Sequence, residues 1–283
     1  MNKHPQHSAQ PARFWSGLSV PALLCLAMLV LPTQKAITSP AEAAICSAAL
    51  GQPTRVEGPG LVGPIRLLSW NIQKSQNQGW VTDLLEIGTD RDLLLIQEAS
   101  TQAMISSTLP QALYLAFAAG YTTRSETTGV LTLSSVEPSL QCNLTAWEPW
   151  LGTPKATNIT EYKLAESEER LLVVNLHAVN FSVGMEDFAA QIDALSPLLN
   201  SHQGPLLVAG DFNTWSTSRH SHLASFMATH QLAAVDFSPD HRTRFWDKPL
   251  DHMYLRGLKA LKAKVVPVAS SDHNPLLVTL EIE

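Results

Sequence analysis

Residues 205–213 read Pro-Leu-Leu-Val-Ala-Gly-Asp-Phe-Asn, an apolar run that ends in a glycine and two polar side chains. A short run of Leu, Val and Ala between turn-forming residues is typical of a buried β-strand. Gly210 lets the backbone turn, so that Asp211 and Asn213 can face the same pocket. A carboxylate and an amide at this spacing can orient a water molecule and hold an anionic oxygen. The stretch therefore predicts a polar site at the end of a strand.

The same pattern, an apolar run followed by a short polar phrase, recurs along the chain. The other instances are Leu68-Ser-Trp-Asn-Ile72, Ile96-Gln-Glu98, Val174-Asn-Leu-His177, Leu250-Asp-His-Met-Tyr254 and Ser270-Ser-Asp-His-Asn-Pro275. One such phrase alone is better explained as a turn, a helix cap or a core residue. Together they indicate strand ends that converge on one site, with ligands suited to a metal ion and a phosphate.

Strand and helix patterns alternate along the chain. Strands are expected at Ile65–Ile72, Asp92–Gln97, Arg170–Leu176, Pro205–Ala209, 251–255, 263–268 and 276–282, with several short strands within 113–165. Helices are expected at Trp80–Ile87, about 100–109, Glu186–Leu199 and 217–229, the last capped by Ser216. This order predicts an α/β fold in which two packed sheets carry helices outside. The absence of a Gly-x-Gly-x-x-Gly motif after the first strand argues against a doubly wound nucleotide fold.

Composition indicates one large globular domain. The chain has 283 residues, of which 45% are hydrophobic and 16% charged, so it can bury a full core. Its net charge is −6 and it has no Lys/Arg cluster, which argues against a tight grip on duplex DNA. The expected partner is a phosphoester substrate, either a nucleic acid met transiently or a phospholipid. No protein partner is predicted, and a monomer is expected.

Residues 1–44 predict a signal peptide. Lys3 and Arg13 precede the apolar stretch Leu18–Leu31, and small residues end at Ala44. The apolar run of about 14 residues is shorter than the roughly 20 that a membrane-spanning helix needs. An uncleaved N-terminal membrane anchor is the alternative. The protein is therefore expected to be exported, either periplasmic or secreted, or to be anchored to a membrane.

Cleavage after Ala44 would leave two cysteines, Cys46 and Cys142. In an oxidising compartment they could form one disulfide, and two free buried thiols are the alternative. Residues 45–64 are rich in Gly and Pro and predict an irregular lead-in. Residues 65–283 then form the domain that carries the polar phrases.

The polar phrases, in this order, resemble the endonuclease/exonuclease/phosphatase superfamily, which contains DNase I-like nucleases, sphingomyelinases and inositol-polyphosphate phosphatases. The phrases that begin at His177, Ala209 and Ser270 are most similar to a bacterial YafD-like subgroup. The resemblance implies a four-layer α/β sandwich, with two packed mixed β-sheets flanked by helices. It places the site at the strand ends between the two sheets.

The resemblance also implies a divalent metal cofactor, Mg²⁺ or Mn²⁺. Glu98 would be the chief metal ligand, with Asn71 beside it, and Asp272 would bind metal or phosphate. Asp211 would orient the attacking water, and Asn213 would hold phosphate. The implied chemistry is metal-assisted in-line attack at phosphorus.

Two histidines complete the implied catalytic set. His177 would lie near the leaving group with Asp251 as its support, and His273 would polarise the scissile group. The second glutamate that orients this first histidine in many nucleases of the superfamily is not evident, and Glu126 is only a guess for it. The predicted function is hydrolysis of phosphoester bonds by a phosphodiesterase or nuclease. The alternatives are a phospholipid or sphingomyelin phosphodiesterase, a phosphomonoesterase, or a non-catalytic binding module.

Overall fold

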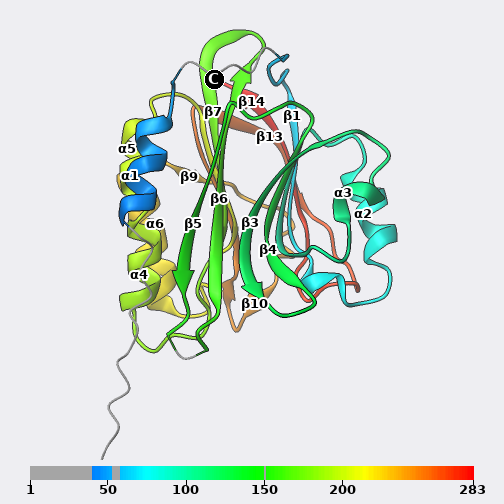
Figure 1. The fold of residues 1–283 in the computed structure, drawn as a ribbon, viewed down its shortest axis with the longest axis vertical. Helices are drawn as coiled ribbons and strands as arrows, with labels where there is room; N and C mark the ends of the chain where they lie inside the picture. Colours follow the sequence, from blue (N-terminus) through cyan, green and yellow to red (C-terminus); the bar gives the residue numbers. More distant parts are fainter. Residues whose placement is uncertain (1–39, 53–57, 150) are drawn as a thin grey trace, which may run out of the picture. The chain divides into compact units, whose positions relative to one another are not determined.

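The computed structural model describes residues 40–52, 58–149 and 151–283 (Figure 1). The apolar stretch Leu18–Leu31 lies outside these residues, so the choice between signal peptide and anchor stays a prediction. Among the helices of the described part, none has the length and apolar character needed to cross a membrane.

Two six-stranded mixed sheets form the centre of the domain. The first has the order β13-β14-β1-β2-β4-β3 and the second the order β5-β6-β7-β8-β12-β9. Each contains one parallel pair. In the first it is β1 (Ile65–Asn71) with β2 (Leu93–Ser100), and in the second it is β7 (Ser167–His177) with β8 (Leu206–Asp211). Parallel neighbours place their carboxyl ends at the same edge of a sheet, so each pair delivers two polar strand ends together.

Antiparallel strands complete both sheets. They are β3 (Tyr114–Thr122), β4 (Thr127–Ser134), β5 (Leu140–Trp147), β6 (Pro154–Leu164), β9 (Ala233–Ala234), β12 (Asp251–Arg256), β13 (Leu258–Val265) and β14 (Leu276–Ile282). A separate two-stranded hairpin consists of β10 (Arg244–Phe245) and β11 (Lys248–Pro249).

Helices cover the outer face of each sheet (Figure 1). The second sheet is flanked by α1 (Pro40–Ala49), α4 (Glu186–Asp193), α5 (Ser196–Ser201) and α6 (Thr217–Thr229). The first sheet is flanked by α2 (Trp80–Gly88) and α3 (Ile105–Thr108), and a short 3₁₀ turn, η1 (Gln73–Ser75), follows β1.

The core is divided into three apolar layers by the alternation of side chains along the strands. Leu67 packs in the layer between the two sheets, whereas Leu68 packs against the layer that contains α2. Val173 lies between the sheets, and Val174 packs in the layer that contains Phe188 of α4. Because neighbouring residues of a strand point to opposite faces, each central strand can fill two layers. The predicted four-layer sandwich of two mixed sheets and outer helices is thus confirmed.

A buried pair of amides joins the two sheets. Gln97 of β2 donates from Nε2 to Asn175 Oδ1 of β7 over 2.6 Å. Asn175 in turn donates from Nδ2 to Leu131 O at 3.1 Å and to Thr132 Oγ1 at 3.2 Å. Both amide side chains are fully buried, and these bonds replace the water that Asn175 and the Gln97 amino group would otherwise lose, while Gln97 Oε1 has no partner.

Some predicted elements have different bounds in the structure. The helix expected over about 100–109 is a single turn, α3. The helix expected over Glu186–Leu199 is divided into α4 and α5, with Pro197 at the start of α5, where its missing N–H costs nothing. The strand expected at 263–268 instead occupies Leu258–Val265. It pairs along the whole of β14, and that pairing outweighs the local pattern of Val and Pro.

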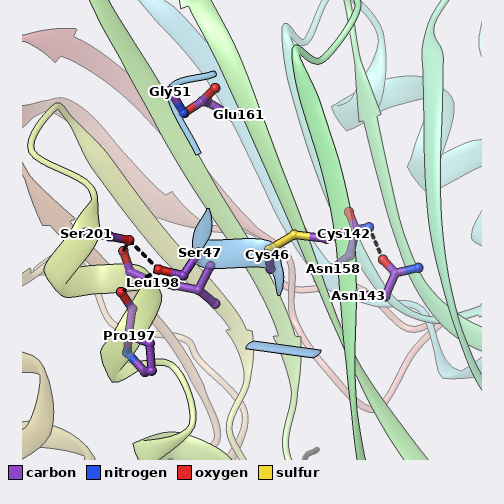
Figure 2. Close-up of a disulfide and its surroundings, with 10 residues drawn as sticks. All are labelled: Cys46, Ser47, Gly51, Cys142, Asn143, Asn158, Glu161, Pro197, Leu198 and Ser201. Atoms are coloured by element: carbon purple, nitrogen blue, oxygen red, sulfur yellow. Dashed lines mark hydrogen bonds between the residues drawn. A yellow bond between two sulfur atoms is a disulfide. The ribbon is translucent and has the colours of Figure 1, made fainter. Parts of the chain in front are cut away.

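The prediction of an irregular lead-in is wrong for its first residues, because α1 continues to Ala49. Cys46 is buried and forms a disulfide with Cys142 of β5 (Figure 2), which decides between the two alternatives for these cysteines. On the opposite side, Ser47 Oγ donates to Pro197 O at 3.2 Å and to Ser201 Oγ at 2.9 Å. The helix is therefore fixed to β5 on one side and to α5 on the other.

Candidate active site

The polar strand ends meet at one edge of the sandwich. Asn71 ends β1, His177 ends β7 and Asp211 ends β8. In the second sheet, Asp211 lies in register with His177 on one side and with Asp251, the first residue of β12, on the other. Glu98 lies near the end of β2, at a positive φ of 51°. That conformation costs an ordinary residue about 1–3 kcal/mol and turns the strand at this point.

A cavity of about 380 Å³ opens between these strand ends. Seven of the eight predicted site residues line it, namely Asn71, Glu98, His177, Asp211, Asn213, Asp272 and His273. The eighth, Asp251, is buried and contacts His273. The structure therefore brings the whole predicted set together.

Asp211 is the most connected carboxylate of the site. Its Oδ2 accepts a hydrogen bond from Asn71 Nδ2 at 2.9 Å, and its Oδ1 accepts from the backbone N–H of Asn213 at 3.0 Å. His177 Nε2 lies 3.4 Å from Oδ2, and His273 Nε2 lies 3.8 Å from the same atom. Burial raises the pKa of Asp211, although the positive charge of His273 opposes that rise. The Asp211 carboxylate is therefore held in a fixed position with its negative charge only partly compensated.

His273 pairs with Asp251 through a hydrogen bond of 2.7 Å between Nδ1 and Oδ2. Burial lowers the pKa of His273, but attraction to Asp251 and Asp211 outweighs that effect and raises it to about 10. The imidazole is thus positively charged at neutral pH. The expectation that Asp251 supports His177 is wrong. The register of β12 directs Asp251 toward the loop before β14, which carries His273. Trp70 Nε1 fixes this loop by donating a hydrogen bond to His273 O at 2.9 Å.

His177 is a neutral histidine with a cationic neighbour. Lys155 Nζ of β6 lies 3.0 Å from His177 Nε2 and 3.9 Å from Glu148 Oε1. Burial, followed by the charge of Lys155, lowers the pKa of His177 well below its ordinary value. Glu126 does not orient this histidine, because its Oε1 instead accepts from Ser100 Oγ at 2.5 Å. Lys155, on the neighbouring strand, therefore contacts His177, whereas the resemblance implied a glutamate in that position.

The donor set suits a hard divalent cation. Glu98 and Asp272 both present carboxylates to the cavity, and the Asp272 side chain is exposed. Burial raises the pKa of Glu98, and Lys155 only partly offsets it, so a bound cation would compensate this charge. Oxygen ligands of this kind are those that Mg²⁺ and Mn²⁺ prefer.

A second group of candidate ligands is less suitable for a metal. Asp211, Asp251 and His273 offer atoms within 4.8 Å of one another. However, Asp251 Oδ2 and His273 Nδ1 are already bound to each other over 2.7 Å, which leaves this group fewer free donor atoms. We therefore expect a metal to be held at the Glu98 side of the cavity, with His273 Nε2 free to contact an anion.

Comparisons with known proteins agree with this geometry. The Endonuclease/Exonuclease/phosphatase family matches residues 68–273, more than half of the chain. The chain belongs to this family. A UPF0294 protein of Vibrio cholerae is 42% identical over 224 residues, which cover 78% of this chain and 79% of that protein.

Solved structures of the same kind share the fold of this endonuclease/exonuclease/phosphatase protein. The human Nocturnin catalytic domain with bound sulfate has a TM-score of 0.58 at 17% identity, covering 82% of this chain and 100% of that one. A mannosyl-6-phosphatase of Bacteroides thetaiotaomicron has a TM-score of 0.58 at 15% identity, covering 77% and 100%. At these identities the likeness concerns the fold alone.

Gly210 of this family member lies inside β8, paired with Leu176 on one side and His252 on the other. Its φ is +143°, and a Cβ at this position would lie 1.9 Å from Leu176 O of the neighbouring strand. Only glycine allows β8 to approach β7 this closely while Asp211 turns into the cavity. The sequence predicted a backbone turn at Gly210, whereas β8 continues in register through Asp211 and the glycine is needed for the close approach to β7.

The site also depends on a buried arginine that sequence reasoning missed. Arg219 of α6 is fully buried and donates from Nη1 to Val179 O at 2.7 Å and to Asn213 O at 3.1 Å. Its Nη2 donates to Asn180 O at 3.2 Å and to Ser182 Oγ at 2.7 Å. The guanidinium thereby joins the loop after β7 to the loop after β8.

A sequence signal for Arg219 did exist. It lies on the same helical face as Leu223, Phe226 and Met227, four, seven and eight residues further on, and all of them are buried. A charged residue on an apolar helical stripe indicates either a buried partner or a functional role. The sequence assigned Lys155 only a weak role at the rim of the site, because its neighbour His177 lies on another strand.

Proposed function

We propose that this endonuclease/exonuclease/phosphatase protein is a phosphodiesterase that depends on Mg²⁺ or Mn²⁺. The observation that carries the proposal is the arrangement of charge around one cavity. Glu98, Asp211 and Asp272 supply carboxylates, while His273 and Lys155 supply positive charge. A phosphodiester needs both, because a metal and a cation must neutralise its oxygens while a carboxylate activates water.

We propose the following division of roles. Glu98 and Asp272 hold the cation, which supplies Lewis-acid polarisation of a phosphoryl oxygen when bound. Asn71 positions Asp211 through its 2.9 Å hydrogen bond, and its own Oδ1 accepts from the backbone N–H of Gln73 at 3.1 Å. Asn71 is therefore better suited to orienting Asp211 than to direct metal ligation. Asp211 accepts a proton from the attacking water, a step favoured by burial, which raises the pKa of this carboxylate.

The remaining side chains face the phosphate. Protonated His273 donates to a non-bridging oxygen, and the amide of Asn213 stands beside it, with Nδ2 already donating to Ala178 O at 3.0 Å. Neutral His177 and the Lys155 ammonium lie together where a leaving oxygen gains negative charge. Lys155 is the stronger candidate for donating to that oxygen, since His177 itself is unprotonated.

We also propose that the protein acts outside the cytoplasm as a monomer. The disulfide between Cys46 and Cys142 supports export, because such bonds persist in oxidising compartments. The net charge of −6 supports a substrate other than long duplex DNA.

Hydrolysis of bis(p-nitrophenyl) phosphate by the full chain tests the proposal. We expect activity that requires Mg²⁺ or Mn²⁺, is abolished by EDTA, and falls about a hundredfold or more in Glu98→Gln. Glu126→Gln is the matched control and should keep wild-type activity, since its carboxylate contacts Ser100. Activity that survives exhaustive chelation, or an active Glu98→Gln protein, would exclude this mechanism. A strong preference for p-nitrophenyl phosphate would instead make the protein a phosphomonoesterase.

A further inference from the structure

An apolar groove continues outward from the active-site cavity. Its lining includes Leu151, Phe181, Val183, Trp215, Phe245 and Leu250, and its volume is about 800 Å³. Four residues line both hollows, namely Leu151, Asn180, Phe181 and Asn213. A molecule whose phosphate lies beside Asn213 can therefore extend along the groove without leaving the protein surface.

The rim of the groove exposes large apolar side chains to water. Trp246 is 87% exposed, Val183 75%, and Phe181 and Leu151 are each 58% exposed. Phe245 joins groove and rim, because its ring centroid lies 6.5 Å from both Trp215 and Trp246. Contiguous exposed apolar surface of this kind is uncommon on soluble proteins and marks a binding surface.

Trp246 occupies a costly position for its side chain. It lies in the two-residue turn of the β10–β11 hairpin with a φ of +57°. Gly, Asn and Asp are the residues that favour such a conformation, whereas a bulky side chain is strained there. Apart from its ring contact with Phe245, this tryptophan buries little of its surface in the domain. Its ring is instead available to something outside the protein.

The chemistry of the groove favours an aliphatic chain over a nucleobase. Leu151, Val183 and Leu250 are aliphatic, the other apolar lining residues are aromatic, and two of the three Asn and Ser side chains in the lining already have partners. Ser182 Oγ accepts from Arg219, and Asn213 Nδ2 donates to Ala178 O. A base would bring ring nitrogens and carbonyls that find few free partners here, whereas an acyl chain needs none. The basic residues of the hairpin are also engaged, Arg244 with Asp240 and Lys248 with Asp247.

We propose that the substrate is a phospholipid presented by a bilayer, with its acyl region along the apolar groove and its phosphodiester in the cavity. The aromatic hairpin tip, Phe245 and Trp246, enters the lipid surface and places the cavity at headgroup depth. This inference rests on the proposed phosphodiesterase function and names its substrate class. Binding is expected to be driven by apolar contact, so raising the salt concentration should weaken it little.

Fluorescence quenching tests the docking surface directly. The full chain is mixed with phosphatidylcholine vesicles whose acyl chains carry bromine, which quenches tryptophan at short range. We expect quenching in the wild type and loss of most of it in Trp246→Phe, which keeps an apolar ring but removes the fluorophore. Leu261→Ser alters an apolar side chain that is 45% exposed on β13, away from the groove, and should leave quenching unchanged. The stretch Leu18–Leu31 is present in every sample, so it does not account for differences between variants.

Hydrolysis separates this inference from the proposed function. Trp246→Ser should lower the rate on phosphatidylcholine vesicles about tenfold or more, with bis(p-nitrophenyl) phosphate hydrolysed at the wild-type rate, because Trp246 lines neither the cavity nor the groove. If the chromogenic diester is hydrolysed but Trp246 is not quenched, the lipid inference is wrong and the phosphodiesterase stands. If Trp246→Ser instead slows hydrolysis of a single-stranded oligonucleotide, this surface binds bases and the inference is again wrong. If vesicles quench Trp246 but no diester is hydrolysed, the proposed phosphodiesterase and the substrate assignment both fail.

Discussion

Replacing Arg219 with Met should reduce both the stability and the activity of this protein. The substitution removes the hydrogen-bond donor of four acceptors, Val179 O, Asn180 O, Asn213 O and Ser182 Oγ. At about 1 kcal/mol for each acceptor left without a donor, the loss is about 4 kcal/mol. Burial lowers the pKa of Arg219 to about 10, so removing the buried charge returns part of that energy. We therefore expect the free energy of unfolding to fall by about 2–4 kcal/mol.

The loss of activity follows from what these bonds position. Without the guanidinium, the loop that carries Asn213 is joined to the loop after His177 by fewer bonds, chiefly the one from Asn213 Nδ2 to Ala178 O, so the phosphate-binding side of the cavity loosens. A displacement of about 1 Å at a reacting group can cost about a hundredfold in rate. We expect a decrease of that order in kcat for bis(p-nitrophenyl) phosphate at a temperature where the variant is folded, as verified by urea denaturation.

Arg256→Met provides the matched control. Arg256 donates to three backbone carbonyls, Leu199 O, His202 O and His230 O, and it lies outside the active-site cavity. Its replacement should lower the free energy of unfolding by about 1–3 kcal/mol while leaving kcat unchanged. If Arg219→Met and Arg256→Met lose similar stability and both keep wild-type kcat, the positioning role of Arg219 is refuted.

Three further predictions concern the strand ends. Gly210→Ala should fail to give folded protein by circular dichroism, since its Cβ would lie 1.9 Å from Leu176 O, whereas Gly58→Ala, with open space around it, should fold; a folded Gly210→Ala protein would contradict this expectation. Lys155→Met should lower kcat for the chromogenic diester about a hundredfold, and Lys155→Arg should lower it less. A Lys155→Met protein with the wild-type kcat would exclude a role for Lys155 at the leaving group. Burial lowers the pKa of His252 to about 3 from 6.5, so its contribution to stability is complete above pH 6.5 and declines as the pH falls. Between pH 7 and pH 5 the free energy of unfolding of the wild type should fall by about 2 kcal/mol because of this residue. Urea denaturation should show a smaller fall for His252→Gln over the same pH range.

The sequence was informative where a residue's neighbours along the chain determine its environment. The run before Asp211 and the runs before Glu98 and His177 are apolar enough to be central strands, and central strands end at the edge where a site can form. Their polar ends were therefore predicted to converge, and the structure brings them together.

The pairing of side chains across strands could not be predicted in this way. His273 takes Asp251 as its partner, and His177 takes Lys155, because strand register places those side chains together. Register depends on how whole strands pack, which no short phrase encodes. The helix at the start of residues 45–64 was also missed, because a contact distant in the sequence, the disulfide of Cys46 with Cys142, holds α1 against β5.

The hydrogen bond between Gln97 and Asn175 couples the geometry of the active site to the alignment of the two sheets. Gln97 directly precedes Glu98, and Asn175 stands two residues before His177, so the pair lies next to the side chains that each sheet contributes. Sliding one sheet over the other would break this 2.6 Å bond and separate the expected metal side of the cavity from its phosphate side at the same time. We therefore expect catalysis only in molecules whose two sheets are correctly aligned. A chain with both sheets formed but not yet docked on each other would be compact and inactive. The return of enzymatic activity during refolding would then follow the last folding step, the docking of the two sheets.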